Sequence, residues 1–276
     1  MNIFVAMDKD QLRNLAESGN FIPGIYNYCD RWCERCPLTS KCLNYATTEA
    51  DFSDPESKDI PNAAFWDKIS EMFKITMEMI QEDTEKLGID LTLTAEDREK
   101  FDTHEKAIKA AIKRNFCTRQ AIRYTKIVNT WFDKSEVIFK DKGIELEGKV
   151  VMDLPGSDPE HELHLLTDAV DVIRWYQYQI FVKIKRALHG VVEDMTDPVE
   201  VEEGFPKDSD GSAKVALTGI DRSIGAWGYL MENLPGNSDD ILDILILLEQ
   251  LRKNVEAKFP DARSFVRPGF DKASSR

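Results

Sequence analysis

Four of the five cysteines of this chain lie within residues 29–42, and their spacing points to metal chemistry. The segment reads C-x3-C-x2-C-x5-C, with thiols at Cys29, Cys33, Cys36 and Cys42. Thiolates are strong metal ligands, and four in so short a segment can surround one metal centre without help from the rest of the fold. In a chain with no sign of export, clustered cysteines indicate metal ligation rather than disulfides. We therefore predict that these four residues bind a metal.

The side chains between the cysteines suit a site built from anionic thiolates. The whole chain has a net charge of −14, but this segment is slightly basic, with Arg31, Arg35 and Lys41 against Asp30 and Glu34. Nearby positive charge favours the thiolate form of cysteine. Pro37 directly follows Cys36, so it ends any helix there and lets the chain turn back toward Cys42.

The spacing also bears on the identity of the metal. Cys29, Cys33 and Cys36 would share one face of a helix, with the outer two about 10 Å apart along its axis. Tetrahedral zinc needs every sulfur about 2.3 Å from one ion, so the segment would have to leave helical geometry. A four-iron cluster is larger and commonly takes its ligands from a short cysteine run. We predict a 4Fe-4S cluster used for electron transfer or redox sensing. The alternative is a structural zinc site on a helical binding or scaffolding module without catalysis.

Three other interpretations of the cysteines are open at this stage. Tyr26, Cys29, Cys33 and Cys36 could form a buried helix face, since free cysteine behaves as a small apolar residue. Two disulfides could form in an exported protein. C-x3-C-x2-C is also the spacing of radical S-adenosylmethionine enzymes, but no alternation of strands and helices follows here, and Cys42 would occupy the iron that those enzymes leave open. The fifth cysteine, Cys117, stands alone, and we predict that it packs in the core.

Two short stretches resemble a family of uncharacterised bacterial proteins. They are the N-terminal cluster CDRWCERCP (29–37) and the later RWYQYQI (174–180). That family combines the N-terminal cysteine cluster with a helical body. Because its function is unknown, the resemblance implies neither an activity nor a site residue.

Apolar residues recur at helical spacing through most of the chain, and no alternation typical of strands is present. We predict an all-α fold: an antiparallel bundle of about six long helices with a small N-terminal four-cysteine segment. The division places the cysteine segment and a linker in 1–61 and the bundle in 62–276. Loops are expected at 47–61, 143–159 and 191–211, and the tail after Phe259 is expected to lack regular structure. The predicted helices cover roughly 9–17, 63–87, 94–115, 119–140, 159–188, 212–233 and 238–258.

Several other polar groups carry weaker signals. His161, His164, Asp168 and Asp171 form one stripe of a helix, opposite its apolar side, so we predict a solvated face rather than half of a metal site. Glu78 and Glu82 belong to a charged stripe, and no Glu-x-x-His follows them to complete a di-metal site. His104 is expected in the core. His189 lies near a predicted helix C-terminus, where a positive charge is favourable.

The composition and one helix bear on partners. The acidic net charge argues against nucleic acid and anionic membranes as partners. Without a recognisable signal peptide, the expected location is cytoplasmic.

Val172, Trp175 and Val182 lie on the polar side of the helix that starts at Pro159. We therefore predict that Trp175 is mostly buried, either under the N-terminal cysteine segment or in a homodimer. The predicted protein partner is a redox partner or a second copy bound through the Trp175 face.

Overall fold

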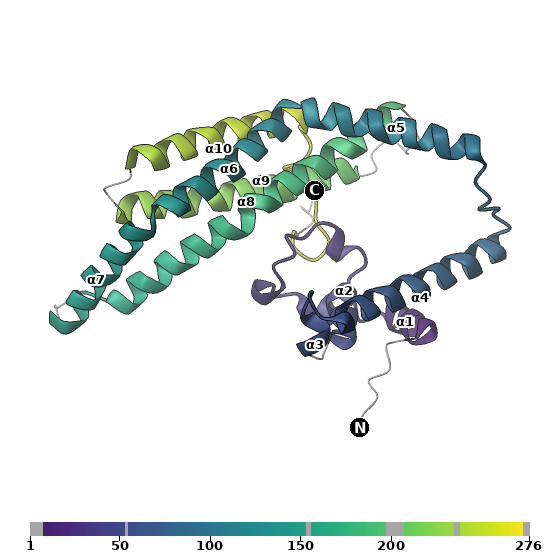
Figure 1. The fold of residues 1–276 in the computed structure, drawn as a ribbon, viewed down its shortest axis with the longest axis horizontal. Helices are drawn as coiled ribbons and strands as arrows, with labels where there is room; N and C mark the ends of the chain where they lie inside the picture. The colour runs from purple at the N-terminus through teal and green to yellow at the C-terminus, as the bar shows by residue number, and fades with distance from the viewer. Residues whose placement is uncertain (1–7, 53–54, 153–155, 197–206, 235–237, 273–276) are drawn as a thin grey trace, which may run out of the picture. The chain divides into compact units, whose positions relative to one another are not determined.

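A computed structural model describes residues 8–52, 55–152, 156–196, 207–234 and 238–272 (Figure 1). Within these ranges the regular elements are helices and no strand is present, which confirms the predicted all-α class. None of the described helices is long and apolar enough to cross a membrane. The chain divides into two compact units, Met1–Asp102 with Arg267–Arg276 and Thr103–Val266.

The first unit is larger than the predicted segment 1–61 because α1 (Lys9–Glu17) is tied to α4 (Ala63–Leu87). The carboxylate of Glu82 accepts a hydrogen bond from Arg13 at 2.9 Å and also bonds to Lys9. Arg13 bonds to Asp83 at 2.9 Å as well. These ion pairs join α4 to the N-terminal segment, and the compact units divide after Asp102 rather than after residue 61.

The stretch 47–61 is not the linker that its polar composition predicts. It contains the end of α2 (Leu43–Asp51) and α3 (Pro55–Lys58), and α3 packs against α4. The ring of Phe52 is buried, with its centroid 5.8 Å from that of Phe65. One buried aromatic contact thus orders a segment that looks like a loop in sequence.

The ends of α4 form as predicted, but its apolar side does not become a core. The side chain of Asn62 accepts a hydrogen bond from the Ala64 amide at 3.0 Å, and Gly88 ends the helix in the left-handed region, at φ 67°. No side chain of α4 is fully buried, and Phe73 is 67% exposed.

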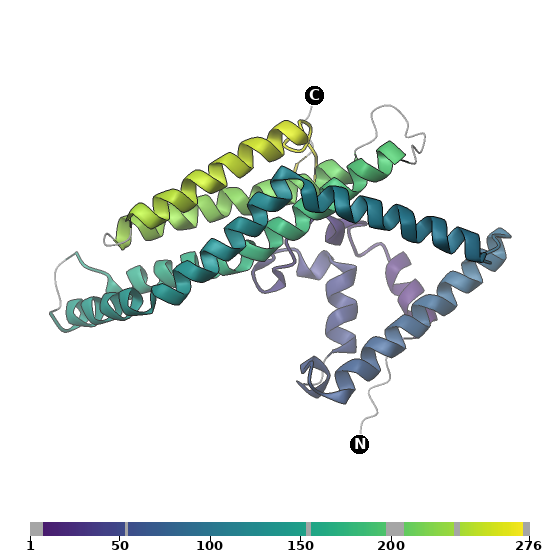
Figure 2. The ribbon, with the colours of Figure 1, turned by 45° about the horizontal axis from the view of Figure 1, so that its top comes forward.

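The second unit is the helical bundle. In it, α8 (Pro159–Thr196) packs against α9 (Asp208–Asn233) and α6 (Phe116–Lys134), while α10 (Ser238–Lys258) packs against α9 and α6 (Figure 2). Two further helices complete the described elements: α5 (Ala95–Arg114), which begins in the first unit, and α7 (Glu136–Met152), which packs on α8.

The described residues of two predicted loops, 143–159 and 191–211, are largely helical. The predicted helix 119–140 is two helices, α6 and α7, separated at Ser135, and α7 continues through the expected irregular stretch to Met152. Glycines at 143 and 148 disfavour a helix by about 1 kcal/mol each. Ion pairs from Lys142 (2.6 Å) and Lys149 (3.0 Å) to Glu162 of α8 oppose that cost.

Gly190 does not end α8, which continues to Thr196. A Cβ atom at this position would lie 3.4 Å from the Cβ of Ser209 in the first turn of α9, an ordinary packing distance. Gly190 therefore lies inside a helix that packs against α9, and its sequence signal for a helix end is misleading. The rest of the predicted 191–211 loop, residues 197–206, lies outside the described residues.

The core of the bundle centres on fully buried aromatic side chains of α6, α8 and α9. Trp227, Tyr124 and Tyr176 are each at most 1% exposed. The indole N–H of Trp227 donates to the hydroxyl of Tyr124 at 3.1 Å. The Trp131 ring meets the Trp227 ring edge-on, with centroids 4.8 Å apart, a favourable geometry for aromatic pairs. Cys117 is buried, as predicted.

Gly219 allows α8 and α9 to pack closely, and its replacement by alanine should destabilise the bundle. A Cβ there would lie 2.8 Å from Cδ1 of Tyr176 and 3.2 Å from Cγ1 of Ile180. We expect Gly219→Ala to lower the free energy of unfolding by about 1–3 kcal/mol, measured by urea denaturation. The matched control is Gly225→Ala in the same helix, where a Cβ meets nothing within 4 Å. That variant should gain about 0.5–1 kcal/mol, and equal effects of the two changes would contradict the packing argument.

Candidate metal centre

The cysteine segment is built from short 3-10 turns rather than an α-helix. The turns are η1 (Ile25–Asn27), η2 (Cys33–Arg35) and η3 (Thr39–Lys41). The interpretation of the cysteines as one buried helix face is therefore wrong. Cys36 ends η2 with φ −84° and ψ 121°, the extended conformation that a residue before proline adopts. Pro37 thus turns the chain as the sequence predicts.

Backbone contacts hold the turns in a closed loop. The amide of Ile22 donates to the carbonyl of Lys41 at 3.0 Å, so the two ends of the cysteine loop are joined. Within the loop, the side chain of Asp30 accepts from the Trp32 amide at 3.2 Å. Arg31 between them has φ 61°, and no other non-glycine residue of the described part has a positive φ. This conformation costs an L-residue roughly 1–2 kcal/mol, so the surrounding contacts must impose it.

The loop brings all four predicted ligands together around one cavity. Cys29, Cys33, Cys36 and Cys42 all line it, and each is a partly buried free thiol. The disulfide alternative therefore finds no support in the structure. The other lining residues are mainly apolar or aromatic and include Ile25, Tyr26, Trp32, Leu38, Tyr45 and Phe270.

The cavity disfavours negative charge that is not compensated. Burial raises the pKa of the Cys33 thiol, and the charges of Cys29, Glu34, Cys36 and Cys42 raise it further. A cation held among the four sulfurs would offset both effects, since metal binding stabilises the thiolate.

Two of the sulfurs have a defined local setting. The amide of Leu38 donates to Sγ of Cys36 at 3.4 Å, a kind of hydrogen bond that tunes metal–thiolate centres. Cys42 is the N-cap residue of α2. The basic residues Arg31, Arg35 and Lys41 are exposed, and the guanidinium of Arg35 lies 4.1 Å from the centroid of the Trp32 ring.

The four thiols line one cavity but are not arranged around a single ion. Among the described residues, no group of three or more His, Cys, Asp or Glu side chains is arranged to hold a single metal ion. This applies to the cysteines and equally to the stripe on α8, where His161, His164 and Asp171 are exposed, as expected for a solvated face.

The remaining candidate residues have structural contacts. Glu82 binds α1, as described above. His189 lies within α8 rather than at its end, with its ring nitrogens 3.3 Å from Glu105 and 3.1 Å from Glu193. His104 is only partly buried, so the expectation of a core histidine is wrong. Trp175 is also only partly buried, and its predicted role in a protein contact stays a prediction.

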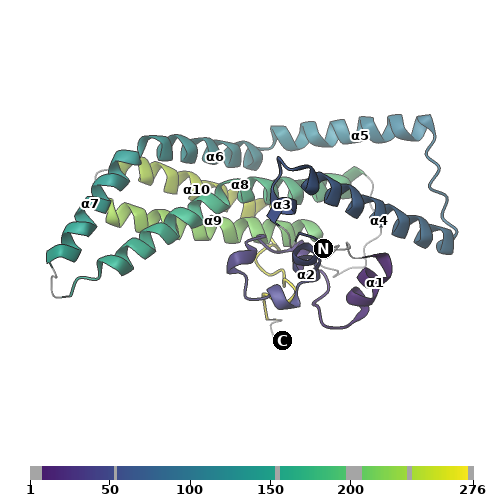
Figure 3. The ribbon, with the colours of Figure 1, turned by 60° about the horizontal axis from the view of Figure 1, so that its bottom comes forward.

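One part of the site escaped the sequence analysis, because it comes from the C-terminal tail. Phe270 lines the cysteine cavity. Gly269 lies against the side chains of Ile22, Ile25 and Leu38. Figure 3 shows this yellow C-terminal segment beside the N-terminal loop. In the sequence, this segment shows only two apolar residues, Pro268 and Phe270, on either side of Gly269. No pattern in the neighbouring sequence predicts that they contact the cysteines at 29–42.

No protein family model, curated protein or solved structure matches this chain. Its function must therefore be argued from the four-cysteine site itself.

Proposed function

We propose that this protein binds a 4Fe-4S cluster through Cys29, Cys33, Cys36 and Cys42 and uses it for electron transfer or redox sensing. The observation that carries the proposal is the convergence of all four clustered thiols on one cavity. Four cysteine thiolates are the usual ligand set of such a cluster.

Two features suit a cluster bound at this cavity. The lining is mostly apolar, and low solvent exposure is one of the factors that set a cluster's potential. The Leu38 amide donates to the sulfur of Cys36, as expected where the protein tunes the cluster's electrons.

A redox role also requires partners of a defined chemical class. A 4Fe-4S cluster bound here would supply one-electron redox chemistry. In this chain, the four cysteines would hold the cluster and the Leu38 amide would adjust its potential. The partner we propose is therefore a redox protein.

The second candidate is a structural zinc site on a helical binding module. It is favoured by the pair Cys33 and Cys36, which lie on either side of a single turn, as the C-x2-C pairs of many zinc sites do. In that case the metal would order the cysteine loop and take no part in electron transfer.

Metal analysis of anaerobically purified protein separates these candidates. A 4Fe-4S cluster predicts about four irons per chain and a broad absorption band near about 400 nm that bleaches reversibly on one-electron reduction. One zinc per chain without colour would instead establish the structural alternative. Four free thiols with no metal of either kind would refute both.

A further inference from the structure

The last described residues of the chain form a short, internally bonded turn, residues 267–271, here called the C-terminal cap. The amide of Asp271 donates to the carbonyl of Arg267 at 3.1 Å. The Arg267 guanidinium holds the carboxylate of Asp271 with two hydrogen bonds of 3.0 Å, and the Arg267 amide adds a third of 3.0 Å. Such a bidentate pair fixes the turn more firmly than an ordinary surface ion pair.

The cap fits the cysteine loop closely at Gly269. A Cβ at this position would lie 2.9 Å from Cδ1 of Ile22 and 3.1 Å from Cδ1 of Ile25, and Ile25 is 2% exposed. Gly269 also has φ 78°, which strongly favours glycine. Glycine therefore lets the cap lie against the loop without backbone strain or displaced isoleucine side chains, and Phe270 beside it lines the cavity of the four thiols.

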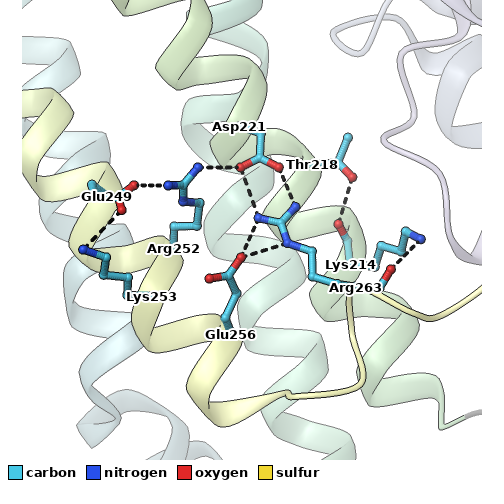
Figure 4. A network of polar contacts seen from close by, with 8 residues as sticks. All are labelled: Lys214, Thr218, Asp221, Glu249, Arg252, Lys253, Glu256 and Arg263. Atoms are coloured by element: carbon cyan, nitrogen blue, oxygen red, sulfur yellow. Dashed lines mark hydrogen bonds and ion pairs between the residues drawn. The ribbon is translucent and has the colours of Figure 1, made fainter.

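The chain just before the cap is anchored independently on the helical bundle. Arg263 bonds to Asp221 at 2.5 and 3.2 Å and to Glu256 at 2.9 Å (Figure 4). Nζ of Lys214 donates to the carbonyl of Phe265 at 2.6 Å. The chain up to Phe265 is therefore fixed to the bundle by its own contacts, and the cap is formed by the residues that follow.

We propose that the C-terminal cap closes the cysteine site, with Phe270 shielding the four sulfurs and their metal from solvent, chelators and oxidants. The inference rests on the proposed metal-binding function for the metal, but the shielding of the thiols holds without it. Gly269 and Phe270 are thus positioning and shielding residues of the site, supplied by the opposite end of the chain.

The test compares Gly269→Ala and Phe270→Ala with the parent chain and a matched control, Gly88→Ala. The control imposes the same left-handed strain, at φ 67°, but its Cβ meets nothing within 4 Å. In anaerobic protein, bathophenanthroline for iron, or 4-(2-pyridylazo)resorcinol for zinc, measures the rate of metal release. We expect metal release to be about tenfold faster in both cap variants. This ratio corresponds to a loss of about 1.4 kcal/mol in the free energy that holds the cap closed. The control should release metal at the parent rate.

A second measurement keeps this proposal separate from the metal proposal. In the reduced, metal-free chain, 5,5′-dithiobis(2-nitrobenzoic acid) should react faster with the clustered thiols of both cap variants than with those of the parent or Gly88→Ala. Faster reaction in a chain that never binds metal would support the cap and refute the metal function. If both cap variants bind metal, release it at the parent rate and show the parent rate of thiol reaction, the proposed shielding by the cap is refuted. The proposed metal binding would then still stand.

Discussion

Replacing Cys33 and Cys36 together by serine should abolish metal binding. The change removes two of four ligands on either side of the turn η2, and serine hydroxyls are far poorer ligands than thiolates for iron or zinc. The expected result is a metal content close to zero per chain and no visible absorption, measured on protein purified without oxygen. Retention of a full metal complement would show that the site lies elsewhere.

The matched control is Cys117→Ala, which removes a buried thiol from the other compact unit. It should keep the full metal content. In Cys33→Ser/Cys36→Ser, limited proteolysis should cut faster within about residues 20–50, because metal ligation would add to the few backbone and apolar contacts that hold this loop. The far-ultraviolet helical signal should stay nearly unchanged, since the bundle has its own core. Global unfolding of the double variant would contradict that independence.

Trp227→Ala should cause the largest loss of stability of any single change in the bundle. Trp227 is 0% exposed, packs against Trp131 and donates a hydrogen bond to Tyr124. Removing a buried aromatic side chain of this size typically costs about 3–5 kcal/mol, a large part of the stability of a domain. Urea denaturation followed by far-ultraviolet circular dichroism measures the loss without relying on tryptophan fluorescence.

Two further variants show whether burial is the cause. Trp66→Ala removes the same side chain where it is 56% exposed, so its effect should be below about 1 kcal/mol. Trp227→Phe keeps an aromatic ring but loses the hydrogen bond to Tyr124, and its cost should fall between those of the two alanine variants. A loss below about 1 kcal/mol for Trp227→Ala would mean that this cluster is not the core.

The sequence by itself determined the features that depend on near neighbours. Helices α1, α4 and α10 have the predicted bounds because their end signals act within a few residues, as with Asn62 before α4 and Gly88 after it. The four-cysteine site could be located for the same reason, since its ligands are close together in the chain. Pro37 restricts the backbone conformation of the residue directly before it, so the extended conformation of Cys36 could also be predicted from the sequence.

Only the tertiary structure decided the features that depend on distant contacts. The ion pairs of Glu162 favour a helix over 136–152, α8 continues past Gly190 where it packs against α9, and the ion pair of Glu82 with Arg13 joins α4 to the N-terminal segment. The same holds for Gly269 and Phe270, which join a cysteine loop from the far end of the chain. Such contacts outweigh local propensities of about 1 kcal/mol per residue, and no pattern within a short window of sequence encodes them.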